Sequence, residues 1–250
     1  MKKVSPSMRI YIGLIITLAI LSAMGVFLPQ GSFSQILPEQ KLPAPKPVLA
    51  VVNAAIALIF YGGLGFIGLK LSQKLGFTDI WDSKVSIKQR LLIPGLIGIG
   101  VGVFLILGDA ILSRFHELGP LPHPPFPLSI VASATAGIGE ELIFRLFFIS
   151  FWVWLISYVI LKNRWQNQIF WIIAILSALA FALGHIPSVM ILFGWNTIKE
   201  IPLALMTEIF LLNGVVSIFA AYYFRKSGFL APVSIHFWTD VVWHVVWGVL

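Results

Sequence analysis

Long apolar stretches recur along the whole 250-residue chain and constrain its fold more than any other feature. Each is roughly 20 residues or longer, the length that an α-helix needs to cross about 30 Å of hydrocarbon. The composition agrees, since 58% of the residues are hydrophobic and only 11% are charged, unlike a soluble domain. The sequence therefore predicts an all-α, polytopic membrane helix bundle with about seven to eight transmembrane helices. The predicted spans are 10–28, 48–71, 91–112, 128–161, 169–193, 203–224 and 229–250.

The distribution of Lys and Arg predicts which side each loop faces. If the N-terminus is cytoplasmic, most of the basic residues fall in the inner loops, which is the bias expected of cytoplasmic loops. This bias accounts for the net charge of +7, so no nucleic-acid partner is expected. We therefore expect an integral protein of the cell membrane. The inner set is Lys2, Lys3, Arg9, Lys70, Lys74, Lys84, Lys88, Arg90, Lys162, Arg164, Arg225 and Lys226, and the outer set is Lys41, Lys46, Arg114 and Lys199.

The chain is predicted to form a single integral membrane domain, 1–250, with loops rich in Gly and Pro. The segment 119–125 holds four prolines, cannot be helical, and is expected to lie over the outer mouth of the bundle. Gly98 and Gly102 have the spacing that lets two membrane helices approach closely. The chain has no cysteine, so neither a thiolate metal site nor a cysteine nucleophile is available.

Three ionisable residues, Glu140, Glu141 and Arg145, stand close together in a stretch that is otherwise almost entirely apolar. A charge in hydrocarbon costs a few kcal/mol unless it is paired or faces a polar cavity, so a polar site is predicted here. At about 100° per residue, Glu141 and Arg145 share one face and can pair, whereas Glu140 points elsewhere. Glu140 is therefore the candidate proton acceptor. Glu141 and Arg145 either support this site or form an ion pair that only sets helix register.

Two further apolar stretches carry histidines. His185 follows Phe181 by one helical turn, so the phenyl ring can pack against the imidazole. His236 and Asp240 are likewise one turn apart, and the carboxylate can fix the tautomer and orientation of the ring. His244, two turns after His236 and near the chain end, is predicted to be interfacial. For His185 the alternative of a simple hydrogen bond between helices stays open.

The three patterns Glu-Glu-x-x-x-Arg, Phe-x-x-x-His and His-x-x-x-Asp occur in this order, each on its own apolar helix. As a set they resemble the CPBP family of intramembrane endopeptidases, which are CAAX proteases and bacteriocin-processing enzymes and are also called the Abi family. The resemblance covers roughly 132–240 and implies a catalytic core at about 128–245. It implies an intramembrane endopeptidase similar to the CAAX prenyl proteases.

The resemblance also implies roles for the motif residues. Glu140, assisted by His185, would activate a water for attack on a peptide carbonyl. His236 with Asp240 would stabilise the oxyanion that develops in the transition state. The last position is often Asn in the family, so Asp240 either is protonated or acts by orienting His236. The implied site residues are Glu140, Glu141, Arg145, His185, His236 and Asp240.

The substrate implied by the resemblance is a membrane-anchored peptide or protein, with or without a lipid, and the mechanism is metal-free. Two histidines and two carboxylates could instead hold zinc, which would also activate water. However, the HExxH spacing that marks the zincins is absent. We therefore expect no cofactor, with zinc as the alternative.

Two other functions remain as alternatives. A proton-coupled transporter would use a relay of Glu140, Glu208, His185 and His236, and Glu208 favours it because the endopeptidase does not need this acid. The structural alternative for Glu208 is a hydrogen bond to a neighbouring helix or to Asn213. A non-catalytic scaffold or immunity protein would bind a partner in the membrane without using the motif residues.

One geometric conflict follows from the predicted spans. A straight helix over 128–161 would be roughly 51 Å long, which is more than a bilayer needs. By the same rise per residue, Glu140 would lie about 31 Å from the cytoplasmic end of its helix and His236 only about 10 Å. The two side chains could not meet. We therefore expect either that the stretch breaks, tilts or extends into the cytoplasm after Arg145, or that the predicted topology is wrong by one crossing. We favour a break near 147–151 that leaves a cytoplasmic extension.

Overall fold

The computed structural model describes residues 4–31 and 42–249. Helices joined by turns and loops make up these two ranges, which contain no β-strand, so the predicted all-α class is confirmed. Six helical stretches in the described ranges are long and apolar enough to cross a membrane. They are Pro6–Gly25, Lys46–Lys74, Lys88–Phe115, Leu128–Ile160, Gln166–Phe193 and Leu203–Ser227.

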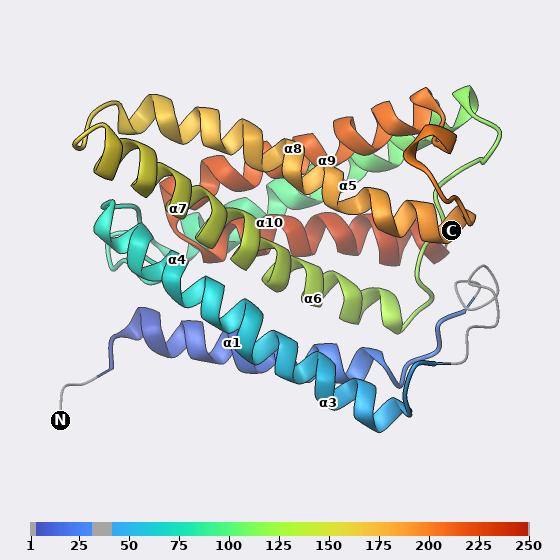
Figure 1. Cartoon of the computed structure of the whole chain (residues 1–250), viewed down its shortest axis with the longest axis horizontal. Helices are drawn as coiled ribbons and strands as arrows, with labels where there is room; N and C mark the ends of the chain where they lie inside the picture. The colour runs from blue at the N-terminus through green and yellow to red at the C-terminus, as the bar shows by residue number, and fades with distance from the viewer. Residues whose placement is uncertain (1–3, 32–41, 250) are drawn as a thin grey trace.

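The seventh predicted span, 229–250, forms a helix that changes its winding twice. It begins as α10 (Leu230–Asp240), widens into the π-helical segment η7 (Val241–Val246) and ends in the 3-10 turn η8 (Trp247–Val249). Helix α1 begins at one end of the bundle, and the described part of the segment that follows α10 ends at the opposite end (Figure 1). Leu250 lies outside the described residues, as do Lys2, Lys3 and Lys41 from the charge count.

The helices lie side by side along the longest axis of the molecule (Figure 1). Helix α10 is central, because it packs against α5, α6 and α9. Helix α1 packs against α3 and α6 on one side, while α8 packs against α9 on the other. The remaining bounds are α1 (Pro6–Gly25), α3 (Lys46–Ile56), η1 (Ala57–Tyr61), α4 (Gly62–Lys74), α5 (Ile93–Leu112), α6 (Leu128–Glu141), η4 (Leu142–Ile149), α7 (Ser150–Val153), η5 (Trp154–Ile160), α8 (Gln166–Phe193) and α9 (Leu203–Ser227).

The contact between α5 and α10 depends on small residues. A Cβ atom at Gly98 would collide with the backbone of Ile235, and one at Gly102 would overlap the side chain of Val242. The hydroxyl of Thr239 donates a hydrogen bond to the Gly98 carbonyl at 3.0 Å. The predicted close approach at the two glycines is therefore confirmed, and it places the histidine-bearing helix in the middle of the bundle.

The helix from α6 through η5 is continuous over Leu128–Ile160, so the predicted break near 147–151 is wrong. Residues 142–160 contain neither Pro nor Gly, which are the residues that usually break a membrane helix. Instead, the helix is inclined to α10 and crosses it (Figure 1). Because of this inclination, the middle of the long helix, which carries Glu140, meets the first turns of α10, which carry His236. The difference in depth calculated for parallel helices therefore does not keep the two side chains apart.

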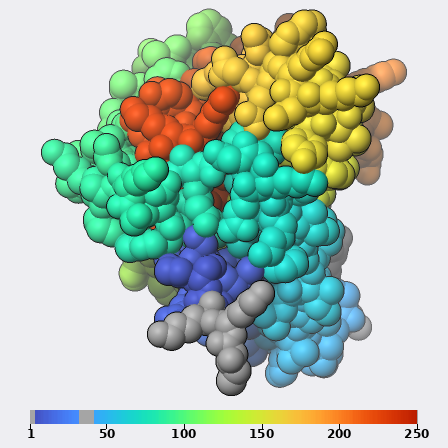
Figure 2. Space-filling view, turned by 90° about the vertical axis from the view of Figure 1, so that its left-hand side faces the viewer, coloured from blue at the N-terminus to red at the C-terminus, as the bar shows by residue number. Residues whose placement is uncertain are grey.

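The connection between α4 and α5, residues 75–87, covers one end of the bundle (Figure 2). The Thr78 hydroxyl donates a hydrogen bond to the Arg225 carbonyl at 2.9 Å, and the Trp81 amide donates one to the Ser7 hydroxyl at 3.1 Å. The turns after α4, η5 and α9 all lie at this end (Figure 1). The loops predicted to be inner are therefore gathered at one end of the molecule.

Candidate active site

Glu141 joins two of the three motif helices. Its Oε1 atom pairs with His236 Nδ1 at 2.8 Å, and its Oε2 atom lies 3.1 Å from Arg145 Nε. The side chains of Glu141 and Arg145 are fully buried. Arg145 thus offsets the charge of Glu141, as the helical spacing predicts, and the same carboxylate holds the imidazole of His236 in place.

Asp240 does not hold His236 in the way that the sequence suggested. Asp240 Oδ2 lies 3.6 Å from His236 Nε2, which is within ion-pair range but longer than a hydrogen bond. The ring is oriented mainly by Glu141, through the opposite nitrogen atom. The predicted proximity of His236 and Asp240 is confirmed, but sequence spacing reveals only neighbours on one helix and not the carboxylate of Glu141, which comes from another helix.

Glu140 lies on a different face of α6, as predicted. Its Oε2 atom is 3.8 Å from His236 Nε2, and its side chain is 35% exposed, whereas that of Glu141 is fully buried. Within the part of the chain that the structure describes, Glu140 Oε2 has no hydrogen-bond partner. Oε2 itself is buried, so the exposed part of the Glu140 side chain is formed by its other atoms.

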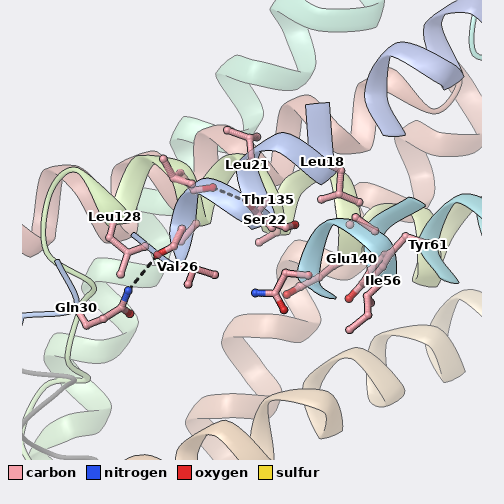
Figure 3. Close-up of a pocket in the computed structure, with 17 residues that line it drawn as sticks. Leu18, Leu21, Ser22, Val26, Gln30, Ile56, Tyr61, Leu128, Thr135 and Glu140 are labelled. Atoms are coloured by element: carbon pink, nitrogen blue, oxygen red, sulfur yellow. Dashed lines mark hydrogen bonds between the residues drawn. The ribbon is translucent and has the colours of Figure 1, made fainter. Parts of the chain in front are cut away.

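Two cavities meet at Glu140. The first, which we call the inner chamber, has a volume of about 270 Å³ and is lined by Glu140, His185, His236 and Asp240 among others. The second, which we call the lateral groove, has a volume of about 560 Å³ and lies between α1, α3 and α6. Figure 3 shows Glu140 among the residues that line this groove. Ala136 and Glu140 line both cavities, so the two spaces adjoin at the free carboxylate.

Phe181 organises the side chains around the inner chamber. Its ring lies edge-on to His185, with ring centroids 5.0 Å apart, and to His236 at 5.6 Å. The Arg145 guanidinium lies over the same ring at 4.7 Å. His185 Nδ1 pairs with the Phe181 carbonyl oxygen at 2.8 Å, so Nδ1 carries the proton in the neutral ring and Nε2 is left as an acceptor. The ring contact predicted for Phe181 and His185 is confirmed.

Residues 116–127 form one wall of the inner chamber, to which they contribute Leu121 and Pro122. His123 Nδ1 in this segment lies 3.1 Å from His244 Nδ1. His244, which was predicted to be interfacial, instead lines the chamber opposite the segment. Its helical spacing from His236 placed it on the correct side of α10 and η7, and the segment expected to lie over the outer mouth of the bundle contacts it through His123.

A second group of buried acids was missed by sequence analysis. Glu208 Oε2 pairs with His116 Nε2 at 3.1 Å, with side-chain exposures of 0% and 1%. Asp109 lies close enough to Glu208 to interact with it electrostatically, and it accepts a hydrogen bond from the Leu121 amide at 3.0 Å. Asn213, the suggested partner of Glu208, donates to the Ile209 carbonyl instead. The available signal was one lone acid in each of two apolar stretches, because such acids usually pair inside a membrane protein.

Comparison with known proteins supplies the family. Residues 122–242 match the family model described as type II CAAX prenyl endopeptidase Rce1-like. The match spans just under half of the chain and identifies these residues as an Rce1-like domain. The match agrees with the resemblance to the CPBP endopeptidases, and all six implied site residues lie inside the Rce1-like domain. Comparisons with the curated proteins and with the solved structures found no match.

The Rce1-like domain accounts for only one side of the site. Helices α6, α8, α9 and α10 lie within 122–242, whereas α1 and α3, which line the lateral groove, precede it. In the described ranges, no three His, Cys, Asp or Glu side chains are placed to hold a metal ion. The arrangement offers a free carboxylate, a nearby imidazole acceptor and a second imidazole held by a buried acid.

Proposed function

We propose that the protein is an intramembrane endopeptidase in which Glu140 activates a water molecule for attack on a peptide bond. The observation that carries this proposal is the position of Glu140, which lines both cavities with its side chain 35% exposed and its Oε2 atom 3.8 Å from His236 Nε2. The Rce1-like family supports the class of reaction. A carboxylate beside a cavity in a membrane span also needs a functional reason, because burial of an unpaired charge is costly.

In this mechanism Glu140 acts first as a general base and then as a general acid. A water molecule in the inner chamber gives its proton to the carboxylate while its oxygen attacks the carbonyl carbon of the substrate. The same proton then passes to the leaving amine nitrogen as the C–N bond breaks, and Glu140 returns to its ionised form. His185 Nε2, the acceptor side of the neutral ring, orients the water from the other side of the chamber.

His236 stabilises the oxyanion. Glu141 holds its Nδ1 atom, so Nε2 remains on the side of Glu140 and Asp240. Three carboxylates around one imidazole favour its positively charged form, in which Nε2 carries a proton that it can donate to the oxyanion. Asp240 acts on Nε2 of the same ring rather than on the substrate.

We further propose that the substrate is a membrane-associated protein ending in a prenylated CAAX motif, that is, a lipid-modified cysteine, two aliphatic residues and a final variable residue. The family description supports this choice. The gathering of basic loops at one end supports a cytoplasmic N-terminus and insertion in the cell membrane. We propose a metal-free mechanism, because the donor side chains within 4–31 and 42–249 are not grouped as metal ligands.

The proton-coupled transporter is less well supported. A relay would have to link Glu208 with Glu140, but Glu208 lines neither the inner chamber nor the lateral groove. The partners of Glu208 are His116 and Asp109, at some remove from the motif residues. These contacts favour a structural role for this acid.

The proposal is tested by cleavage of an S-farnesylated, fluorogenic peptide ending in Cys-Val-Ile-Met, with the purified protein in liposomes and mass spectrometry of the products. We expect cleavage by the unmodified protein and none by Glu140→Gln. The matched control is Glu208→Gln, which makes the same chemical change at a buried acid outside both cavities and should retain cleavage. Cleavage by Glu140→Gln at the normal rate would remove this residue from the mechanism, and loss of activity on treatment with a zinc chelator would overturn the metal-free proposal.

A further inference from the structure

The lateral groove carries polar side chains at intervals along its length. On one side α6 contributes Thr135 and Glu140, and on the other side α1 and α3 contribute Ser22 and Asn53 (Figure 3). From Leu128 to Glu140, α6 rises about 18 Å along the groove. An extended polypeptide advances about 3.3 Å per residue, so the groove has room for roughly five residues.

Asn53 is a polar group in the groove without a hydrogen-bond partner for its side chain in the described residues. It is exposed, it belongs to a helix that crosses the membrane, and no hydrogen bond to it is found in the described ranges. Thr135, by contrast, donates to the Val131 carbonyl at 2.8 Å, and Gln30 donates to the Leu28 carbonyl at 3.0 Å. An unpaired amide at membrane depth is costly, so the position of Asn53 indicates a polar occupant.

Tyr61 brings the same wall of the groove up to Glu140. A Cβ atom at Gly139 would lie only 3.2 Å from Tyr61 Cε1, so the missing side chain of Gly139 lets the phenol ring lie against α6. Tyr61 and Glu140 are close enough to interact electrostatically, and both line the groove in Figure 3. Asn53, two turns before Tyr61, therefore stands on a path that ends at the free carboxylate.

We infer that the lateral groove binds an extended segment of the substrate, N-terminal to the cleaved bond, and that Asn53 forms hydrogen bonds with its backbone. This inference rests on the proposed function. An amide side chain offers both donors and an acceptor, as an extended backbone does, so the two can pair in both directions. Because Ala136 and Glu140 line both cavities, a chain lying in the groove passes Glu140 and continues into the smaller inner chamber. Asn53 and Tyr61 lie outside residues 122–242, so this contact belongs to the N-terminal helices.

The kinetic test uses the farnesylated peptide with eight residues upstream of the cysteine. Asn53→Leu should raise KM about three- to tenfold, as expected for the loss of one or two hydrogen bonds, and leave kcat unchanged. Asn53→Gln, which keeps the amide group, should have a KM close to that of the unmodified protein. N-methylation of the amides at the upstream positions of this peptide should raise KM for the unmodified protein. For Asn53→Leu, the methylated and unmethylated peptides should have the same KM. An equal KM in Asn53→Leu and the unmodified protein would overturn the inference.

Filling the groove gives a second test. Ala132→Trp introduces a large side chain at a residue that lines the groove, so we expect KM to rise. The matched control is Ile59→Trp, because Ile59 is 76% exposed and lines neither cavity. If Ala132→Trp changes KM equally for the full peptide and for a farnesylated tetrapeptide without upstream residues, the groove holds the lipid and the inference is wrong.

Photo-crosslinking separates this inference from the proposed function. In the Glu140→Gln protein, benzoylphenylalanine at Ile56 in the groove should crosslink to the farnesylated peptide, whereas the same probe at Ile59 should not. If the unmodified protein cleaves the peptide but Ile56 gives no crosslink, the groove inference fails and the proposed function stands. If Ile56 crosslinks but no protein form cleaves, the binding site stands and the proposed mechanism fails.

Discussion

The bundle contains two clusters that each gather acids around a histidine, and they differ in their surroundings. In the first cluster, Glu141 pairs with His236 and Arg145, while Glu140 faces two cavities with 35% of its side chain exposed. In the second, Asp109, Glu208 and His116 are buried together and the acids contact neither cavity. Residue types alone do not distinguish a candidate active site from a structural cluster, whereas access to a cavity does.

The two clusters also differ in what their charges hold together. The first joins α6 to α10 through a carboxylate that also binds Arg145, so a second carboxylate is left free for chemistry. The second joins α5, α9 and the segment 116–127 through contacts within the cluster. Loss of an acid from the first cluster should therefore affect catalysis, and loss from the second should affect stability. The predictions below test this difference.

The largest effect is expected at Glu140. Glu140→Gln removes the proton acceptor but keeps the size of the side chain, and kcat/KM should fall by about 10²- to 10⁴-fold. Thermal unfolding in detergent should be nearly unchanged, because Glu140 is the least buried of the motif acids. A large drop in unfolding temperature would show that Glu140 is structural, like the acids of the second cluster.

His236→Ala should reduce kcat by about 10²- to 10³-fold, because it removes the donor to the oxyanion. It also leaves Glu141 with Arg145 as its remaining partner, so some loss of stability should accompany the change. Single-turnover measurements would separate the chemical step from binding. A rise in KM without a change in kcat would contradict the proposed role.

Glu208→Leu should lower stability strongly while leaving the active site in place. Removal of one partner from a buried charged pair costs about 3–5 kcal/mol. The measurement is denaturant unfolding in mixed micelles, together with cleavage per folded molecule, which should stay within about threefold of normal. A selective loss of cleavage without destabilisation would place Glu208 in the mechanism after all.

His244→Ala should have a small effect. His244 lines the inner chamber but pairs with His123 rather than with a motif residue, so we expect a change in kcat/KM below about threefold, in the range of a single neutral hydrogen bond. Steady-state cleavage assays at neutral pH would measure it. A loss as large as that of His236→Ala would extend the catalytic cluster to this end of the chamber.

The segment 116–127 should loosen in acid. Burial lowers the pKa of His123 below its usual range, and the nearby charge of Asp109 offsets only part of this effect. A detached His123 has an ordinary pKa of about 6.5, so protonation below that value favours the detached segment, and docking is most stable above it. After correction for the intrinsic pH dependence of amide exchange, the protection of the segment should be lower at pH 5.5 than at pH 7.5, and His123→Gln should remove most of that difference. Equal protection at both pH values would refute this coupling.

Sequence analysis was most successful for features within one helix. The pairing of Glu141 with Arg145 and the separate direction of Glu140 both follow from the angle between successive residues. The spans were identified because hydrophobic length is a local property. The close packing at Gly98 and Gly102 was also predicted, since small residues limit what can lie beside them.

Contacts between helices could not be predicted, because they depend on tilt and rotation. Glu141 rather than Asp240 orients His236, and nothing in the spacing of either helix indicates this. The break expected near 147–151 followed from assuming parallel helices, and inclination of α6 removed the need for it. Asp109 and His116 were overlooked because each is isolated in the sequence and gains its meaning only from Glu208.

The lateral groove has walls of different origin, and this has an evolutionary consequence. One wall belongs to the Rce1-like domain and the opposite wall to helices that precede it. Mutations in α1 and α3 can therefore reshape what the protein selects while the hydrolytic side chains stay untouched. Chimeras that exchange these two helices between homologues should transfer preference for a target without rebuilding the machinery that cuts it.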